Sequence, residues 1–391
     1  AQAGFGQLGC RPMGASKRVA AAVLALGVAT YLRSLSNGKQ PCLEYQAFLD
    51  HYPITVFSRD AIHGAHFGPS KAISVPSLLA RFDWRYGSWA GPKELEHLLR
   101  AEEHRGVQDP RTVYTGPLAV ERLLNIASQT FDAEHVGRVV VVFAGNAMLL
   151  SDTLAASNVS QAALVQRLRR FFGTIWFVGT DIDVEGIRTA PCGLSEQYLR
   201  PDGFLEDAMA AIQGARPDEH GKTRGVLWPM ATSETRCDNA TYDYWRKGFG
   251  LECESKMSAH AWATTSTAGR AGVEVRNVTF PTSRDVDLWS EVSKYKFLIS
   301  PLGKYIQAPQ TIGALLVLTV PIVQRGPAST HDELLQRGFP LAVVNTWDEV
   351  TPRNLEKWWR DLGPRLASFR RNCLTSDAYW RMLIGELDRC E

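Results

Sequence analysis

One loop in the second half of the chain carries groups suited to binding a phosphorylated ligand. Phe297–Ser300 is an apolar run typical of a buried strand, and Pro301 and Gly303 break it into a loop. A helical segment begins near Pro309, so its first N–H groups could meet a phosphate. Five residues are the candidates for a nucleotide-binding site at this point: Ser300, Gly303, Lys304, Gln310 and Thr311.

Two further groups of titratable side chains have weaker spacing. His63 and His66 are three residues apart in a glycine-containing loop, and no third metal ligand accompanies them. Asp181 and Asp183 follow a predicted strand, where a general base or a metal pair can lie. Acidic residues also favour strand exits because they accept turn hydrogen bonds. We expect no metal site.

Several established signatures are missing from the sequence. There is no C-x-x-C for a structural zinc and no G-x-S-x-G nucleophile elbow. Gly221-Lys222-Thr223 lacks the upstream glycine spacing of a Walker phosphate loop. We therefore expect no bound cofactor.

The elements that would position these residues alternate between strand and helix. Apolar or alternating runs predict strands at 54–57, 71–79, 138–143, 174–178, 225–228, 273–280, 297–300, 319–323 and 341–344. Amphipathic spacing predicts helices at 92–103, 115–127, 161–172, 241–248, 285–295, 309–318, 354–359, 365–371 and 378–387. This alternation predicts an α/β fold with parallel sheets, and residues 201–225 are the best linker between two domains.

The composition is that of an ordinary globular protein. The chain has 391 residues and a formal net charge of +2, without a basic block, which argues against nucleic acid as a partner. Among seven cysteines, Cys373 could pair with Cys390, and Cys237 with Cys253. Asn158, Asn239 and Asn277 begin N-glycosylation triplets, which weakly favour a lumenal domain.

Residues 293–323 resemble the C-terminal motif of exostosin-like glycosyltransferases of the GT-B type, including relatives common in algae and protists. The matching residues are Lys296-Phe297, Ser300-Pro301, Gly303, Ala314-Leu315 and Pro321-Ile322-Val323. Ala190-Pro-Cys-Gly-Leu194 is similar to the stretch that closes the N-terminal domain in the same family.

The chain departs from the family motif where the motif carries charge. Gln310 stands at the family's arginine, Gly313 at its glutamate and Gln307 at its acidic position, while Thr319 replaces a glycine. An arginine fork would neutralise the diphosphate of a sugar-nucleotide donor, and a glutamine cannot reproduce it. The scaffold residues match and the charged residues do not, which is the pattern of a retained fold with altered or lost catalysis.

The resemblance implies two Rossmann-like domains in a GT-B arrangement, at 40–215 and 222–350, with C-terminal helices at 352–391 that pack back across them. It implies transfer of sugar from a nucleotide-sugar donor if the protein is active. Asp60 and His63 then stand where an inverting transferase of this architecture can place its catalytic base. The alternative is a catalytically dead protein of the same fold, serving as a structural or accessory subunit of a membrane protein complex.

An apolar run near the N-terminus is the expected membrane contact. Residues 1–16 are poorly patterned, and the run Val19–Leu32 is flanked by Lys17-Arg18 and Arg33. Fourteen helical residues reach about 21 Å, short of a bilayer core of about 30 Å, although the flanking basic side chains extend the segment. A single transmembrane anchor at 17–35 is favoured over a signal-peptide core or a buried helix. The family default is a lumenal domain in the Golgi or endoplasmic reticulum, and a chloroplast or mitochondrial membrane is the alternative.

Overall fold

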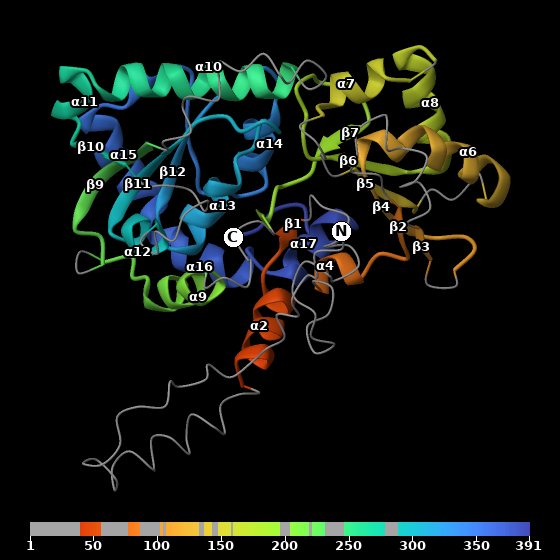
Figure 1. Cartoon of the computed structure of the whole chain (residues 1–391), viewed down its shortest axis with the longest axis horizontal. Coiled ribbons are helices and arrows are strands. Elements are labelled where there is room, and N and C mark those ends of the chain that lie inside the picture. Colours follow the sequence, from red (N-terminus) through yellow and green to blue (C-terminus); the bar gives the residue numbers. More distant parts are fainter. Residues whose placement is uncertain are drawn as a thin grey trace, which may run out of the picture.

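The protein has a mixed α/β fold with two sheets of mainly parallel strands, which lie side by side in Figure 1. The computed structural model describes residues 40–55, 77–86, 102–104, 107–132, 137–142, 148–157, 159–195, 204–218, 221–230, 246–277 and 288–391. The fold is consistent with two Rossmann-like domains, as the alternation of strands and helices predicts. We call residues 40–195 the N-terminal unit and residues 204–391 the C-terminal unit.

The sheet of the N-terminal unit has the order β3-β2-β4-β5-β6-β7. Its strands are β2 (Trp84–Tyr86), β3 (Glu102–His104), β4 (Thr112–Thr115), β5 (Val139–Val142), β6 (Thr174–Phe177) and β7 (Ile187–Thr189). Only β3 is antiparallel to its neighbour. All four valines of β5 are buried, because the strand has neighbours and packing on every side. The predicted strands at 138–143 and 174–178 are thus confirmed.

Helices cover this sheet and form a hydrophobic core with it. They are η4 (Pro117–Ala119), α6 (Val120–Thr130), α7 (Leu150–Ala155) and α8 (Gln161–Phe171). Leu123, Leu164 and Leu168 from these helices join Val140 and Phe177 in one buried cluster. Ser160 caps α8, its hydroxyl accepting a hydrogen bond from the Ala163 amide, so the helix begins where its amphipathic pattern begins.

The first residues of the N-terminal unit agree with the predicted strand at Ile54–Thr55 and differ from the prediction in two later segments. Here α2 (Gln40–His51) leads into β1 (Ile54–Thr55), which pairs in parallel with β8 (Leu194–Ser195). The expected strand at 71–79 is wrong for Ser77–Ala80, which form α4. The expected helix at 92–103 is wrong for Glu102 and Glu103, since pairing with β2 outweighs their helical spacing.

The C-terminal unit is built on five parallel strands in the order β10-β9-β11-β12-β13. The strands are β9 (Arg224–Met230), β10 (Val273–Asn277), β11 (Tyr295–Ser300), β12 (Val320–Gln324) and β13 (Ala342–Val344). The order reverses between β9 and β11, and ligands of such sheets lie beyond the carboxyl ends of the strands at this switch point. The predicted loop after Ser300 is therefore at the edge where a ligand would bind.

Helices surround this second sheet. They are α9 (Phe204–Gly214), α10 (Arg246–Ala263), α11 (Ser266–Arg270), α12 (Leu288–Ser293), α13 (Pro309–Leu316) and α14 (Thr330–Gln336). The predicted helix at 309–318 is confirmed as α13, and the one at 285–295 corresponds to the shorter α12. Of the helix expected at 241–248, residues 246–248 begin the much longer α10, and the rest lies outside the described residues.

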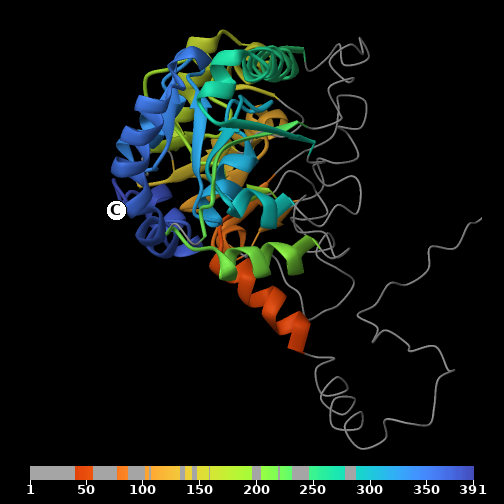
Figure 2. The same ribbon diagram turned by 90° about the vertical axis from the view of Figure 1, so that its left-hand side faces the viewer.

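Three C-terminal helices pack along one side of the molecule, as Figure 2 shows. They are α15 (Pro352–Leu362), α16 (Leu366–Asn372) and α17 (Ser376–Leu383). They contact the N-terminal unit directly, because Trp176 Nε1 donates to the Leu383 carbonyl at 2.7 Å and Tyr379 Oη donates to the Cys192 carbonyl at 3.0 Å.

The disulfide between Cys373 and Cys390 is present, as the sequence predicts. Cys253 is also disulfide-bonded, but its predicted partner Cys237 lies outside the described residues. The proposed anchor at 17–35 lies outside them as well. Within the described ranges, none of the helices combines the length and the apolar character that crossing a bilayer requires.

Candidate functional site

The loop between β11 and α13 is a tight turn held by its own backbone. Gly303 and Ile306 exchange backbone hydrogen bonds, with Ile306 N donating to Gly303 O at 2.9 Å. A β-carbon on Gly303 would lie 2.7 Å from the Gln307 carbonyl oxygen, so only glycine fits here. Ile306 has a φ of 67°, which is strained for a β-branched residue. Gly303 thus serves the shape of the loop.

Three of the five predicted binding residues lie together at the end of β11. The hydroxyls of Ser300 and Thr311 are 2.9 Å apart, and Gln310 Nε2 donates to Ser300 Oγ at 3.2 Å. Ser300 and Thr311 are buried, and Gln310 and Lys304 are half-buried. The structure therefore brings Ser300, Gln310 and Thr311 into one group, but their polar atoms bind one another.

Apolar side chains fill the space beside this loop. Leu302 and Ile306 from the loop form a cluster with Leu149, which precedes α7 in the N-terminal unit, and with Leu251 on α10. We call these four residues the apolar plug. Ile306 fits tightly, since a β-carbon on Gly326 would come within 2.9 Å of its Cγ2 atom. The plug occupies the junction between the two units at the carboxyl end of β11.

Helix α10 covers the same edge of the sheet. Figure 1 draws it across the top of the C-terminal unit with one end directed toward α7. Ser255, in the middle of α10, accepts a hydrogen bond from the Leu302 amide at 3.0 Å and donates to Gln324 Oε1 at 2.9 Å. This single hydroxyl ties the helix to the carboxyl ends of β11 and β12.

Gln307 joins the two units rather than facing a ligand. Its Nε2 donates to the carbonyls of Val178 and Ala190, at 2.9 and 2.8 Å, and its Oε1 accepts from the Cys192 amide at 2.7 Å. The side chain is 4% exposed. A carboxylate at this position would face two carbonyl oxygens, so the family's acidic residue does not fit this environment.

Gly313 leaves room for an aromatic side chain. A β-carbon on Gly313 would lie 3.3 Å from Trp289 Cη2 and 3.4 Å from Cζ3. Trp289, on α12, is buried against the hydrophobic core. The indole thus packs closely against position 313, and any side chain longer than glycine there would press on it.

Thr319 accepts a hydrogen bond from a buried lysine, Lys222, at the amino edge of the sheet. The Nζ atom of Lys222 donates to Ser293 O at 2.7 Å, Val317 O at 2.8 Å and Thr319 Oγ1 at 2.9 Å. Burial, and secondly the positive charge of Arg370, lower the pKa of Lys222 to about 7. Three acceptors match the three N–H bonds of an ammonium group.

The two cations stabilise the end of a helix. Arg370 Nη1 donates to Leu316 O and Ile212 O, and Lys222 donates to Val317 O, so both contact the C-terminal end of α13. Basic groups are favourable there because the helix carries partial negative charge at that end. Lys222 precedes β9, at the edge opposite the ligand edge, which agrees with rejecting Gly221-Lys222-Thr223 as a phosphate loop.

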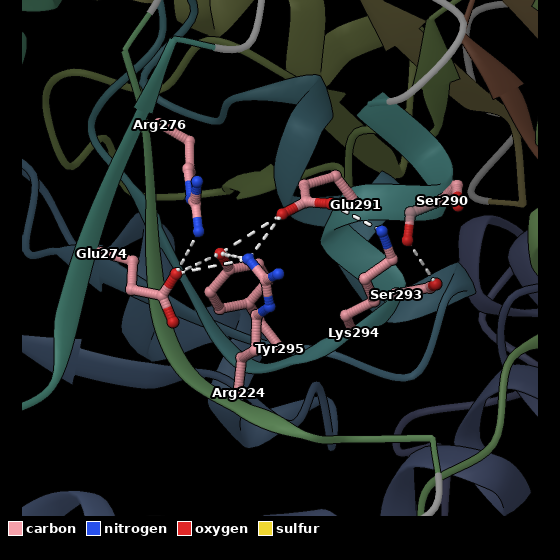
Figure 3. Close-up of polar contacts among 8 residues, drawn as sticks. All are labelled: Arg224, Glu274, Arg276, Ser290, Glu291, Ser293, Lys294 and Tyr295. Carbon is pink, nitrogen blue, oxygen red and sulfur yellow. Dashed lines mark hydrogen bonds and ion pairs between the residues drawn. The ribbon is translucent and has the colours of Figure 1, made fainter.

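A network of charges lies at this amino edge, as Figure 3 shows. Arg224 donates to Tyr295 Oη at 2.8 Å and pairs with Glu291 and Glu274. Burial raises the pKa of Glu274, but hydrogen bonds from Arg276 and Tyr295 together bring it below its ordinary value. Every charged side chain drawn there has a partner of opposite sign, so the network joins β9, β10, β11 and α12.

The acidic residues after β6 also have structural partners. Asp181 accepts from Ser151 N at 2.9 Å and Ser151 Oγ at 2.6 Å, at the start of α7. Asp183 accepts from Ser329 N and Oγ in the opposite unit, and these hydrogen bonds lower its pKa. The described ranges contain no group of three or more metal-ligating side chains. Asp60 and His63 lie outside those ranges.

Several residues at the junction of the units were not predicted from the sequence. Thr330 Oγ1 lies 2.6 Å from Thr180 Oγ1, and Glu333 accepts from the amide and hydroxyl of Thr189. Threonines that cross a domain junction have no characteristic spacing, so no sequence pattern identifies them. Gln307 could be singled out from the sequence, because it replaces the acidic residue of the motif that this segment resembles.

The comparisons with known proteins leave the family open. No protein-family model matches the chain, and no curated protein matches it. The resemblance to exostosin-like glycosyltransferases therefore stays a prediction that depends on the residues named above.

Proposed function

We propose that this protein is a non-catalytic relative of the GT-B glycosyltransferases, in which the two-domain scaffold serves as a structural or accessory subunit of a membrane protein complex. The apolar plug is the observation that carries the proposal. A diphosphate needs positive charge or aligned N–H groups around it, whereas leucine and isoleucine side chains occupy this junction.

The replaced motif residues support the same proposal. Gln307, Gly313 and Thr319 each complete a contact inside the protein, and the family's charged residues would disrupt two of these contacts. Ser300, Gln310 and Thr311 hydrogen-bond one another. The sequence changes at the donor positions are thus coordinated with the packing around them, which is expected of a scaffold selected for its shape.

The disulfides bear on the compartment. Disulfides persist in oxidising compartments and are rare in the cytosol. The Cys373–Cys390 bond, together with the bonded Cys253, favours a lumenal location for the two units, with residues 17–35 as the membrane anchor.

Calorimetric titration of the full chain in detergent with UDP, GDP and their sugars tests the proposal. We expect no binding heat with any of these nucleotides. Binding that Lys304→Ala weakens would place a working donor site at the loop after Ser300 and would favour an active transferase instead. Gln336→Ala, at the far end of α14, is the matched control because it leaves the loop unchanged.

Native electrophoresis in mild detergent tests the accessory role. The chain should migrate as part of a larger assembly when it is extracted from its own membrane. Migration of all the protein as a free monomer would contradict a subunit role.

A further inference from the structure

Helix α14 and the residue before it make several polar contacts between the two units that involve a titratable group. Ser329 N and Oγ donate to Asp183, Thr330 Oγ1 donates to the Thr180 carbonyl at 2.7 Å, and Glu333 accepts from Thr189. All three residues lie in the first turn of α14 or just before it. We call Ser329, Thr330 and Glu333 the latch.

A buried histidine lies inside this turn. His331 directly follows Thr330, is 3% exposed, and its Nδ1 atom has no hydrogen-bond partner in the part of the chain that the structure describes. Burial lowers the pKa of His331 to about 4, and Asp332 and Arg325 act on it in opposite directions. The imidazole is therefore neutral in the closed arrangement at neutral pH.

The charged groups around the latch come from every element packed against it. They are Asp332, Glu333 and Arg337 on α14, Arg325 after β12, Asp183 and Arg188 from the N-terminal unit, and Asp388 near the C-terminus. Arg325 pairs with Asp332 on the exposed side of the helix. Since Asp332 is thereby already engaged, it offers His331 little compensation for taking up a proton.

We propose that α14 is an acid-sensitive latch: when His331 takes up a proton, the first turn of α14 leaves the N-terminal unit. This movement exposes His331 to water, where the charged imidazole is well solvated. A neutral imidazole fits the closed latch better than a charged one, because the side chain is buried and its Nδ1 atom has no described hydrogen-bond acceptor.

The expected size of the effect follows from the two protonation equilibria. A solvated histidine titrates near 6.5 and the closed latch holds the pKa at about 4, so acidification through this window favours the open state by up to about 300-fold. The effect begins as the pH falls below 6.5 and is complete near 4. Asp183 responds only at lower pH, because the hydrogen bonds from Ser329 lower its pKa.

Hydrogen exchange of the full chain in detergent, corrected for the intrinsic rate at each pH, tests this latch. The amides of Ser329 and Thr189 donate across the junction, so their protection reports closure directly. We expect their protection to fall up to about 300-fold between pH 6.5 and 4, while the amides of β5 keep theirs. Unchanged protection of both amides down to pH 4, or a parallel loss in β5, would overturn the proposal.

Variants identify the group that responds. His331→Asn cannot titrate and should keep both amides protected to pH 4, whereas His51→Asn, at an exposed position on α2, should respond like the native chain. If His331→Asn does not fold, Ser329→Ala takes its place. It removes the hydroxyl bond to Asp183 and keeps the backbone one, so the Thr189 amide should start less protected and still respond between pH 6.5 and 4. A Ser329→Ala protein without that response would contradict the latch.

Discussion

Contacts inside the protein account for three of the four positions where this chain differs from the exostosin-like motif that it resembles. Gln307 bonds to three backbone groups of the N-terminal unit, and Thr319 receives a hydrogen bond from Lys222. Gly313 accommodates the ring of Trp289. The neighbouring groups therefore determine which residue type fits at each of these positions. Changing one of them alone should lower the stability of the protein.

Replacing Gln307 by glutamate should destabilise the protein by about 3 kcal/mol near neutral pH, because a buried carboxylate would face the carbonyls of Val178 and Ala190. Urea unfolding measures the change. The loss should shrink in acid, where the protonated side chain can donate to one carbonyl. Gln310→Glu, at a half-buried position, is the control and should cost much less; equal losses would argue against a special role for Gln307.

Replacing Lys222 by methionine should cost about 2 kcal/mol at pH 6, since three buried acceptors lose their donor. The cost should grow above pH 7. The folded state releases the Lys222 proton near pH 7 and the unfolded state only near 10.5, so native stability gains about 1.4 kcal/mol per pH unit between these values.

The methionine variant lacks this gain because it has no group to titrate. Unfolding of both proteins across pH 6–10 measures the difference. Lys294→Met, which removes a partly exposed ion pair with Glu291, is the control and should change stability by less than about 1 kcal/mol at any pH. A constant difference between the native chain and Lys222→Met would contradict the burial effect.

At the scale of the elements, the edge where a ligand would bind is closed by the loop after β11 and by α10. The loop needs its glycine, because Gly303 lies against the Gln307 carbonyl. In α10, by contrast, open space surrounds Gly250, so a larger side chain fits there. The two positions thus differ in whether a β-carbon fits: it does not at Gly303 and it does at Gly250. A matched pair of substitutions separates the two cases.

Gly303→Ala should destabilise the protein by at least about 2 kcal/mol, since its β-carbon would lie 2.7 Å from backbone oxygen. Gly250→Ala should stabilise it by about 0.5–1 kcal/mol, because the position is helical and open space surrounds the new methyl group. Thermal unfolding of both variants checks the pair. Two changes of the same sign would show that the loop is less tight than the structure has it.

The strands were predictable to a large extent because burial on both faces leaves continuous runs such as Val139–Val142 and Phe297–Ser300. The length of α10 was not, since Gly248 and Gly250 interrupt its pattern and its contacts with Leu302 come from a distant part of the chain. The position of the candidate loop could be predicted from local sequence. Its filling by Leu149 and Leu251 could not, because that depends on how the two units meet.

At the scale of the whole molecule, the C-terminal residues hold the two units together. Cys390 N donates to Arg337 O at the end of α14, and its disulfide fixes it to Cys373 at the end of α16. The guanidinium of Arg337 lies 4.5 Å from the ring centre of Trp176 in the N-terminal unit. The disulfide therefore supports contacts that cross the junction.

Cys390→Ser should lower the free energy of unfolding by about 3 kcal/mol, the value expected for closing a loop of this length. Chemical unfolding of the variant, with and without reductant, measures it. Reductant should destabilise the native chain at least as much as the substitution does. Cys192 is buried, so we expect reductant to have no effect at that residue. No difference between the native chain and the variant would show that the tail is dispensable.

The hydrogen bond from Trp176 to Leu383 also has a consequence for how the protein is made. The two residues are 207 positions apart, so the buried indole leaves the ribosome well before its acceptor exists. At the usual speed of synthesis the delay is about 10–40 s. During that time the first sheet lacks the helix that covers it, and its apolar face is available to chaperones. Slowing translation should therefore lengthen chaperone engagement of the nascent chain, and the last eight helical residues, Ser376–Leu383, should end it.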